Sequence, residues 1–385
     1  MSDTFDARSL PARVDAVVAG AGLAGASVAR ALALRGLRVL VLEAERAPGT
    51  HASGRSAAIL RRVIDDPSTA ALARRGGAAL EDPPPDLAPE HPLLDRHGVL
   101  LAAGPGAAGA ALAATAEAAR RSGLRVERPA AGAAARRAPA FAGGPATEFA
   151  WCPDDGTVDV AGLLAALLRS ARARGAIVAA GAALRVVRVA GGAVASVETG
   201  RGRVRTGLLV DAAGAAADPV AALAGLPPLG LDPLRRHLFH LGANPRVPHG
   251  GPTAWDTERS VYLRPDGTGV LASPCDEDPF PAGREEPRVV PAARTLLAER
   301  LAAAFPRYGR FVVRRARAGL RTFAPDRRFV LGPDPRLRGF AWAAGLGGHG
   351  VSTAVAVGEA AADLVLDGRS GIVDAAAVLP GRLMR

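Results

Sequence analysis

The chain has 385 residues, a formal net charge of +11, a hydrophobic fraction of 49% and only 4% aromatic residues. This length is enough for a large core divided between two lobes, and Ala, Val and Leu must supply most of that core. No apolar run approaches the roughly 20 residues that a membrane-spanning helix needs, so no membrane span is expected.

The basic residues argue against several functions. All of them are Arg, because the sequence contains no Lys, and pairs such as Arg61-Arg62 are dispersed and never interleaved with aromatics. A nucleic-acid binder needs a clustered basic surface, so no nucleic-acid partner is expected. The absence of Lys excludes a Schiff-base lysine, a P-loop lysine and lysine-based activation of oxygen.

Two further features bear on the cellular location. The chain has 2 Cys, too few for a disulfide framework. Residues 1–13 carry acids and polar residues ahead of the first apolar run, which is not the layout of a signal peptide. We therefore expect a cytoplasmic protein with reduced thiols, and no metal site is predicted.

The first predicted elements form a βαβ unit. Residues 15–20 are a short apolar run that ends in glycine, as a buried parallel strand does. The run leads into Gly20-Ala-Gly22-Leu-Ala-Gly25, a helical stretch over 26–35 and a second buried strand over 37–42. This order predicts a dinucleotide site, although the motif alone does not separate FAD from NAD.

Each part of this motif has a physical role. Gly20 permits the tight turn, Gly22 lets the backbone approach a pyrophosphate, and Gly25 allows close packing of helix and strand. The helix N-terminus offers N–H groups to the phosphates, and Glu43 is placed to accept hydrogen bonds from a ribose. The candidate nucleotide contacts are Gly20, Gly22, Leu23, Ala24, Gly25, Glu43 and Ala44.

A glycine- and hydroxyl-rich segment follows, Pro48-Gly-Thr-His-Ala-Ser-Gly-Arg-Ser-Ala-Ala58. It resembles the P-G-x-H-x-T-G-R-S-A-A stretch of the D-amino acid oxidase superfamily of FAD-dependent oxidoreductases. Within that superfamily it is most similar to the bacterial D-amino acid and D-arginine dehydrogenases. The resemblance implies that the cofactor is FAD and that a set of consecutive residues lies along it, namely Ser53, Gly54, Arg55, Ser56, Ala57 and Ala58.

The resemblance continues over nearly the whole chain. Residues 208–214 resemble the strand and glycine turn that close against the FAD pyrophosphate, which makes Ala213 and Gly214 candidate contacts. Asp159 is a candidate N-cap for a helix over residues 160–174.

A second cofactor motif is expected near the C-terminus, where Gly347-Gly-His-Gly350 precedes a helical run over 351–366. In the family, this helix N-terminus points at the flavin pyrimidine and stabilises the negative charge of the reduced ring. The candidate contacts are Gly347, Gly348, His349, Gly350, Val351, Ser352 and Thr353. Related sarcosine oxidases attach flavin to a Cys near the motif that corresponds to residues 319–323, where this chain has none, so noncovalent FAD is expected.

The fold class implied is α/β, with a Rossmann-like FAD-binding domain and an interleaved α+β substrate domain built on an antiparallel sheet. The expected FAD-binding domain comprises residues 1–80, 150–225 and 323–385. The expected substrate domain comprises residues 81–149 and 226–322.

The resemblance also implies a substrate clamp. A planar guanidinium holds a carboxylate by two hydrogen bonds, and Arg321 matches the family's carboxylate-binding Arg. Tyr262 matches a Tyr that bonds the same carboxylate, and Gly348 is expected to present its carbonyl to the amine. Arg235 or Arg236 matches another active-site Arg, with Arg236 preferred.

The chain departs from D-arginine dehydrogenase at four expected pocket positions. Val99 replaces a Glu that reads the substrate guanidinium, and Ile64 replaces a lid Tyr. Ile59 replaces a His, and Arg61 replaces a Thr. A pocket without its acid does not favour a cationic side chain, so a neutral or apolar substrate side chain is expected, and Arg61 leaves an acidic one open.

The predicted function is FAD-dependent oxidation of the amine-bearing carbon of a D-amino acid to the imino acid, by hydride transfer to flavin N5. One alternative is an N-methylated or cyclic amino acid, or a secondary-metabolite amine, oxidised on the same fold. A non-catalytic flavin-binding subunit is another. The expected electron acceptor is oxygen or a quinone. No catalytic role is assigned to His349, because hydride transfer from a neutral amine needs no strong base.

Overall fold

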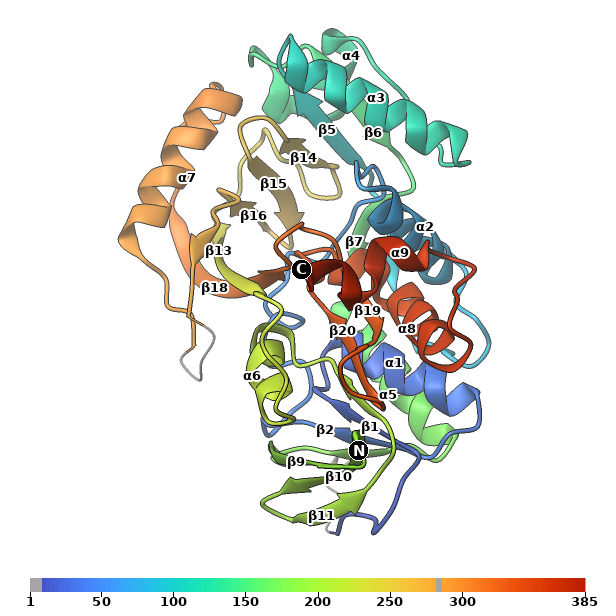
Figure 1. Ribbon diagram of the computed structural model, residues 1–385. Coiled ribbons are helices and arrows are strands. Elements are labelled where there is room, and N and C mark those ends of the chain that lie inside the picture. Colours follow the sequence, from blue (N-terminus) through green and yellow to red (C-terminus); the bar gives the residue numbers. More distant parts are fainter. Residues whose placement is uncertain (1–8, 282–285, 385) are drawn as a thin grey trace.

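The computed structural model describes residues 9–281 and 286–384 of the chain. Residues 1–8, on which part of the signal-peptide expectation depends, lie outside the described residues. Two sheets organise the molecule, one in the lower half of Figure 1 around β1 and β2, the other in the upper half around β13 to β16.

The lower sheet is a parallel sheet with one antiparallel edge strand. Its strand order is β19-β20-β12-β1-β2-β8, and only the β19–β20 pair is antiparallel. The strands are β1 (Ala16–Ala19), β2 (Val39–Leu42), β8 (Ile177–Ala179), β12 (Leu209–Asp211), β19 (Val330–Pro333) and β20 (Phe340–Ala344). Strands buried on both faces read as continuous apolar runs, which is why Ala-Val-Val-Ala forms β1.

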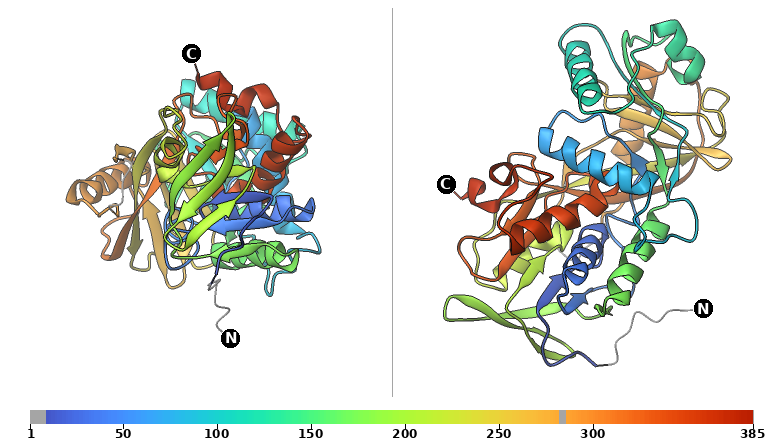
Figure 2. Two further views of the ribbon diagram at one scale, coloured as in Figure 1. Left: turned by 60° about the horizontal axis from the view of Figure 1, so that its bottom comes forward. Right: turned by 90° about the vertical axis from the view of Figure 1, so that its right-hand side faces the viewer.

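Alternate side chains of β1 enter two different cores. Val18 joins the core under the helices, whereas Val17 faces the opposite layer, because successive strand residues point to opposite faces. Helices α1 (Leu23–Leu34), α2 (Pro67–Glu81), α5 (Val160–Ala173) and α8 (Gly350–Leu366) lie side by side on the first face (Figure 2). The opposite layer contains β9 (Leu184–Ala190), β10 (Ala193–Thr199), β11 (Gly202–Arg205) and α6 (Ala217–Ala222).

The upper sheet has the order β17-β13-β16-β15-β14-β5-β6, and β18 pairs with β13 along its length. All of its pairs are antiparallel except β14 with β5. The strands are β5 (Val99–Ala103), β6 (Glu148–Cys152), β13 (Asp232–Leu241), β14 (Thr253–Asp256), β15 (Val261–Asp266), β16 (Gly269–Ser273), β17 (Asp278–Pro279) and β18 (Val313–Phe323). The predicted α/β fold class with a second, largely antiparallel sheet is confirmed.

The two faces of the upper sheet have different neighbours. Helices α4 (Ala131–Arg137) and α7 (Pro291–Ala304) pack on one face, in the core that contains Phe239 and Leu263. The other face contains Tyr262 and Val99 and is covered by α3 (Ala107–Arg121) and by the chain segment around Ile59. This second face is the one turned toward the lower sheet.

Short elements complete the described chain. Strands β3 (Ile59–Leu60), β4 (Leu94–Asp95) and β7 (Gly156–Val158) form a small sheet between the two halves. Helix α9 (Ala375–Val378) and the 3-10 turns η1 (Pro139–Phe141), η2 (Gly214–Ala216) and η3 (Pro380–Leu383) lie in connections and at the C-terminal end. Within residues 9–281 and 286–384, no helix is long and apolar enough to cross a bilayer.

Some expected boundaries differ from the observed ones. Helix α1 begins at Leu23 rather than at residue 26, because Gly22 is its N-cap. The domain boundary expected at residue 150 falls inside β6, which belongs to the upper sheet, so the proposed division must place all of β6 with the substrate side. The predicted N-cap of α5 is confirmed, because the Asp159 side chain accepts a hydrogen bond from Gly162 N at 2.9 Å.

The crossing of α1 and α8 depends on a glycine. The Gly358 N–H donates to Ser27 Oγ at 3.2 Å, and a Cβ at Gly358 would overlap the Ser27 backbone. We predict that Gly358→Ala forces the two helices apart and lowers the free energy of unfolding by about 1–3 kcal/mol, despite the better helix propensity of Ala. Urea unfolding of the FAD-loaded protein measures this. Gly371→Ala is the control, since a Cβ there meets no atom within 4 Å; equal stability of the two variants would contradict the prediction.

Candidate active site

The turn between β1 and α1 leaves no room for side chains. Gly20 has φ +100°, and a Cβ there would lie 2.6 Å from the Ala212 carbonyl oxygen. A Cβ at Gly25 would overlap the Gly20 carbonyl oxygen. Both glycines are therefore required for the close approach of β1, α1 and β12, and the backbone at the start of α1 stays open to a ligand.

The segment after β2 folds back onto the start of α1. Leu23 N donates to Ser53 Oγ at 3.0 Å, and Gly49 N donates to Ala21 O at 3.1 Å. Gly22, the N-cap residue, provides no side-chain cap. The remaining N–H groups and the positive end of the helix dipole can therefore serve a phosphate.

Glu43 lies beside this turn, 8% exposed. Its carboxylate accepts hydrogen bonds from Ala21 N at 2.8 Å and from Glu45 N at 2.9 Å, one on each oxygen. A carboxylate oxygen has two lone pairs, so each oxygen can still accept a ribose hydroxyl. Ala44, the next residue, is exposed at the same edge.

The segment 53–58 passes from the nucleotide end to the upper sheet. Gly54 N donates to Gly49 O at 2.8 Å, which closes the loop. The Arg55 guanidinium donates to Ala318 O at 3.4 Å and pairs with Glu286 at 2.6 Å, and Arg317 donates to Ser56 O at 3.0 Å. Arg55 and Ser56 are thus anchored to β18 as well as being placed along the expected cofactor path.

Ala57 and Ala58 end this segment. Ala57 is buried, and Ala58 has φ +59°, a conformation that L residues other than Gly, Asn and Asp rarely adopt. Ala58 O accepts from Val158 N at 2.7 Å, which holds the strained backbone in place.

The other two cofactor segments approach from β12 and from α8. Ala213 N donates to Asp211 Oδ1 at 3.0 Å, and a Cβ on Gly214 would meet no atom within 4 Å. At the start of α8, His349 is the N-cap and its side chain makes no capping bond. The helix therefore presents the N–H groups of Gly350 and Val351 at its open end.

The Ser352 and Thr353 hydroxyls form hydrogen bonds within the protein. Ser352 Oγ accepts from Arg61 N at 3.1 Å and donates to Ile59 O at 3.4 Å. Thr353 Oγ1 donates to His349 O at 3.0 Å. Both hydroxyls are occupied within the protein, and Ser352 ties the pocket segment to α8.

Strand alternation separates Arg235 from Arg236. In β13, Leu238 lies on the face turned toward the lower sheet, so Arg236 lies on that face and Arg235 on the other. Arg236 donates to Asp276 O at 2.6 Å and pairs with Glu277 at 3.0 Å. Arg236 also stands opposite Gly319 of β18 in the register, whereas Arg235 pairs with Asp278. The structure places Arg236 on the site face.

Arg321 lies on the same face of β18, against the start of α8. Gly348 has φ +87°, and a Cβ there would overlap Arg321 Nε, so only Gly permits this contact. Burial lowers the pKa of Arg321 to about 10, and Arg236 adds to the effect, while Tyr262 opposes it. Arg321 remains charged at neutral pH, and no described residue supplies a carboxylate partner.

Tyr262 completes this group. Its side chain is 1% exposed, and its hydroxyl makes no hydrogen bond of full geometry among the described residues, with Ser273 and Arg321 as its polar neighbours. Burial raises the pKa of the phenol, and Arg321 opposes that rise. Tyr262 is therefore a neutral donor, and the hydroxyl lacks an acceptor that a bound carboxylate could provide.

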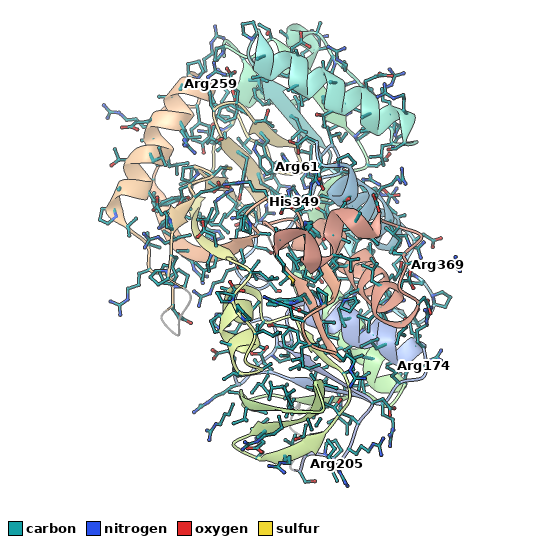
Figure 3. All side chains as sticks on the ribbon, in the orientation of Figure 1. Arg61, Arg174, Arg205, Arg259, His349 and Arg369 are labelled. Atoms are coloured by element: carbon teal, nitrogen blue, oxygen red, sulfur yellow. The ribbon has the colours of Figure 1, made fainter. Side chains whose placement is uncertain are left out.

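Two of the expected pocket residues, Ile59 and Val99, pack in the same buried cluster as Tyr262, at 9% and 0% exposure. Ile64 is also buried, at 7% exposure. The Arg61 guanidinium lies 4.7 Å from the centre of the Trp255 ring, and that ring lies 4.8 Å from the Tyr262 ring. Arg61 and His349 lie close together where the two halves of the molecule meet (Figure 3).

The pKa of His349 is affected by the arginines near the start of α8. Burial lowers the pKa of His349 to about 3, and the nearby guanidinium groups of Arg61, Arg321 and Arg236 lower it further in that order. The imidazole is therefore neutral at every physiological pH. The three arginines converge on one place, which is strongly electropositive.

Two structural residues of the site were not among the sequence expectations. Trp255 orients Arg61, and Arg317 holds the Ser56 carbonyl. Alternation along residues 313–323 would have placed Arg317 on the face of Arg321, which is the only sequence signal for it. Trp255 has no comparable signal, because its position beside Tyr262 follows from the register of β14 with β15.

One group of possible metal ligands occurs in the described residues, His237, Asp276 and Asp278, with ligand atoms within 4.8 Å of one another. His237 Nδ1 faces Asp276 Oδ2 at 2.6 Å, and His237 Nε2 accepts from Val290 N at 3.1 Å. Both ring nitrogens are in use, so the group acts as a tie between β13 and the segment that leads to α7.

The residues present fit FAD. The backbone cradle at Gly20 and Gly25 has no room for a Cβ, and Glu43 retains free lone pairs. The N-cap residues of α1 and α8, Gly22 and His349, make no side-chain capping bond. The α1 start would hold the pyrophosphate, Glu43 the adenosine ribose, and the α8 start the flavin pyrimidine. In this arrangement the segment 53–58 would follow the cofactor between its two ends.

Solved structures with this fold are known. L-proline dehydrogenase from P. horikoshii matches with a TM-score of 0.87 and 21% identity, covering 98% of this chain and 99% of that chain. Glycine oxidase from Geobacillus kaustophilus matches with a TM-score of 0.80 and 23% identity, covering 96% and 98% of the two chains. At these identities the likeness shows the fold.

The sequence itself matches a family over most of its length. The model of FAD dependent oxidoreductases, DAO, matches residues 15–364. Mitochondrial sarcosine dehydrogenase of Mus musculus is 27% identical over 233 residues, which are 57% of this chain and 25% of that protein, so the chain spans about a quarter of this relative. With the fold and the cofactor cradle in agreement, the chain belongs to the DAO family of FAD-dependent oxidoreductases, and its cofactor is FAD.

Proposed function

We propose that this enzyme oxidises the amine-bearing carbon of an amino acid, with a D-amino acid as the first candidate. The observation that carries the proposal is Arg321, a charged guanidinium that has no carboxylate partner among the described residues and lies against the start of α8. The neighbouring Tyr262 hydroxyl also lacks a partner. An anionic planar group satisfies both side chains at once.

The two side chains define how a substrate is held. The guanidinium of Arg321 donates two parallel hydrogen bonds to the carboxylate, and Tyr262 donates a third. Fixing the carboxylate fixes the adjacent carbon, so that its hydrogen faces the cofactor while the amine lies toward the Gly348 carbonyl. Bound FAD supplies the acceptor for the hydride that leaves this carbon. The resulting imino acid hydrolyses in water after release.

The electropositive surroundings serve the reaction in a second way. Oxidation requires a neutral amine, and the charges of Arg61, Arg236 and Arg321 disfavour the ammonium form by like-charge repulsion. His349 stays neutral beside these groups and provides no strong base, which agrees with a reaction that needs none.

The choice of substrate side chain follows from the pocket walls. Val99, Ile59 and Ile64 provide no carboxylate for a cationic side chain, so lysine- and arginine-like substrates are disfavoured. The D configuration is the one that the segment 48–58 suggests by its resemblance to D-amino acid dehydrogenases.

A second candidate is a secondary or cyclic amine that carries a carboxylate. It is favoured by the names of similar proteins, sarcosine dehydrogenase and L-proline dehydrogenase, and it uses the same Arg321 clamp. The electron acceptor in either case is oxygen or a quinone. A cytoplasmic location stays a prediction from the sequence.

The reaction class is tested by anaerobic mixing with D- and L-amino acids, N-methylated amino acids and proline, while the absorbance of oxidised flavin is followed. We expect bleaching by neutral or acidic D-amino acids or by a secondary amine, and none by D-arginine. Arg321→Met should bind FAD and lower kcat/KM by roughly 100-fold or more, as expected for a lost charged hydrogen-bond pair. Arg315→Met, at an exposed position of the same strand, should behave as wild type. Flavin that no such compound bleaches would overturn the proposal.

The neutral His349 predicts a pH effect on stability. In the unfolded chain the pKa of a His is about 6.5, so below this pH the unfolded state binds a proton that folded His349 does not take up until about pH 3. Stability is therefore lost as the pH falls from 6.5 toward 3. Between pH 7 and 5, wild type should lose about 2 kcal/mol more than His349→Gln in urea unfolding. Parallel losses in the two proteins would show that His349 is protonated in the fold.

The mode of FAD attachment is a separate prediction. The described chain has free Cys152, which is buried, and Cys275, and neither lies in the segment 319–323. We expect acid precipitation to release all flavin into the supernatant as free FAD. Flavin absorbance that stays with the precipitated protein would contradict noncovalent binding.

A further inference from the structure

Arg61 is a second charged group of the site that the clamp for one carboxylate does not use. Its backbone N–H donates to Ser352 Oγ at 3.1 Å, which fixes the residue beside the first turn of α8. Its guanidinium is among the charges that act on His349, together with those of Arg321 and Arg236. Arg61 therefore faces the same electropositive region as the carboxylate clamp.

The Arg61 side chain lacks an anionic partner. No carboxylate of the described residues pairs with it, and its buried Nε has no hydrogen-bond acceptor there. Two acids act on the charge of Arg61: Asp65, which is exposed, and Asp155, which is bonded to Arg62 at 2.6 Å. Burial lowers the pKa of Arg61, and the Asp65 carboxylate opposes part of that shift. A partly buried cation whose Nε has no acceptor is costly unless a ligand provides the missing partner.

The orientation of the guanidinium is fixed nevertheless. It lies over the Trp255 ring at 4.7 Å, and Trp255 is in turn packed against Tyr262. A cation–π contact contributes about 0.5–2 kcal/mol, which is less than the cost of burying an uncompensated charge. Stacking on Trp255 therefore orients the Arg61 guanidinium. It does not explain why a cation is retained at this position.

Arg61, Arg236 and Arg321 differ in whether they already have hydrogen-bond and ion-pair partners in the protein. Arg236 is committed to Asp276 O and to the Glu277 carboxylate. Arg61 and Arg321 have no such partners among residues 9–281 and 286–384. A substrate with one carboxylate satisfies Arg321 and leaves Arg61 uncompensated. The apolar walls at Ile59 and Val99 strengthen any ion pair formed here, because they lower the local dielectric.

We propose that Arg61 binds a second carboxylate, so that the preferred substrates are dicarboxylic amino acids. This inference rests on the proposed oxidation of an amino acid held by Arg321. It states that the site selects substrates by the charge of their side chain. The sequence alone allowed either a neutral or an acidic side chain.

The first experiment compares pairs of substrates in which one member has a second carboxylate and the other does not. D-glutamate is compared with D-glutamine, D-aspartate with D-asparagine, and iminodiacetate with N-methylglycine for the secondary-amine case. Wild type should favour the dicarboxylic member by about tenfold or more in kcat/KM, the effect of a charged pair in a dry site. Arg61→Gln should abolish the preference, Arg61→Lys should keep part of it, and Arg174→Gln, an exposed control (Figure 3), should keep all of it.

The second experiment does not depend on turnover. Succinate and glutarate are titrated against propionate and butyrate into the FAD-loaded enzyme, and binding is followed through the flavin absorbance. Tighter binding of the dicarboxylates by wild type and not by Arg61→Gln would support the inference even if no amino acid reduces the flavin. That outcome separates a failure of the proposed reaction from a failure of the specificity assignment.

Stability distinguishes binding from a structural role. Because Arg61 is a partly buried cation without an ion-pair partner among the described residues, Arg61→Gln should keep or raise the melting temperature of the ligand-free holoenzyme. Equal affinity of wild type for mono- and dicarboxylates, or a preference that survives in Arg61→Gln, would overturn the proposal. So would a marked loss of stability in Arg61→Gln with the substrate preference unchanged.

Discussion

The candidate site depends on the contact between Arg321 and Gly348. Arg321 belongs to a strand of the upper sheet, and Gly348 belongs to the loop that starts α8 above the lower sheet. A Cβ at Gly348 would overlap the Arg321 side chain, so the guanidinium reaches the open helix start only because a glycine with positive φ stands there. This contact places a fixed cation beside the expected flavin edge, and Tyr262 and Arg236 are arranged around it.

The region around Arg321 and the start of α8 is electropositive. The N-cap residues of α1 and α8 make no side-chain capping bond, so N–H groups at both positive helix ends remain for the cofactor. Arginines of the upper sheet act on His349 at the start of α8. The ligands expected there are all anionic or become so: a pyrophosphate, a carboxylate and a reduced flavin. His349 is neutral at physiological pH and so adds no positive charge to that of the arginines. Partly buried cations without acidic partners, such as Arg61 and Arg321, raise the energy of the free enzyme, and they select for anionic ligands.

Local patterns were sufficient for much of the fold. The apolar run of β1, the glycines after it and the terminal Glu43 predicted a βαβ unit, and the structure contains it with α1 starting slightly earlier. The Asp159 N-cap was also predictable, because a capping side chain acts on an amide three residues away. The domain boundaries were less predictable. Strand β6 crosses the expected boundary at residue 150, because it pairs with β5, which is distant in the sequence.

The sequence by itself determined the fold class, the cofactor cradle and the residue types available to the site, since these depend on short-range periodicity and on glycine geometry. Only the tertiary structure decided which arginines meet. Arg236 rather than Arg235 faces the site because the pairing of β13 with β18 sets which residues share a face. Trp255 orients Arg61 because β14 pairs with β15 in one register. Tertiary packing decides whether an arginine from one segment meets a carboxylate from another. A local sequence pattern carries no information about such a distant contact.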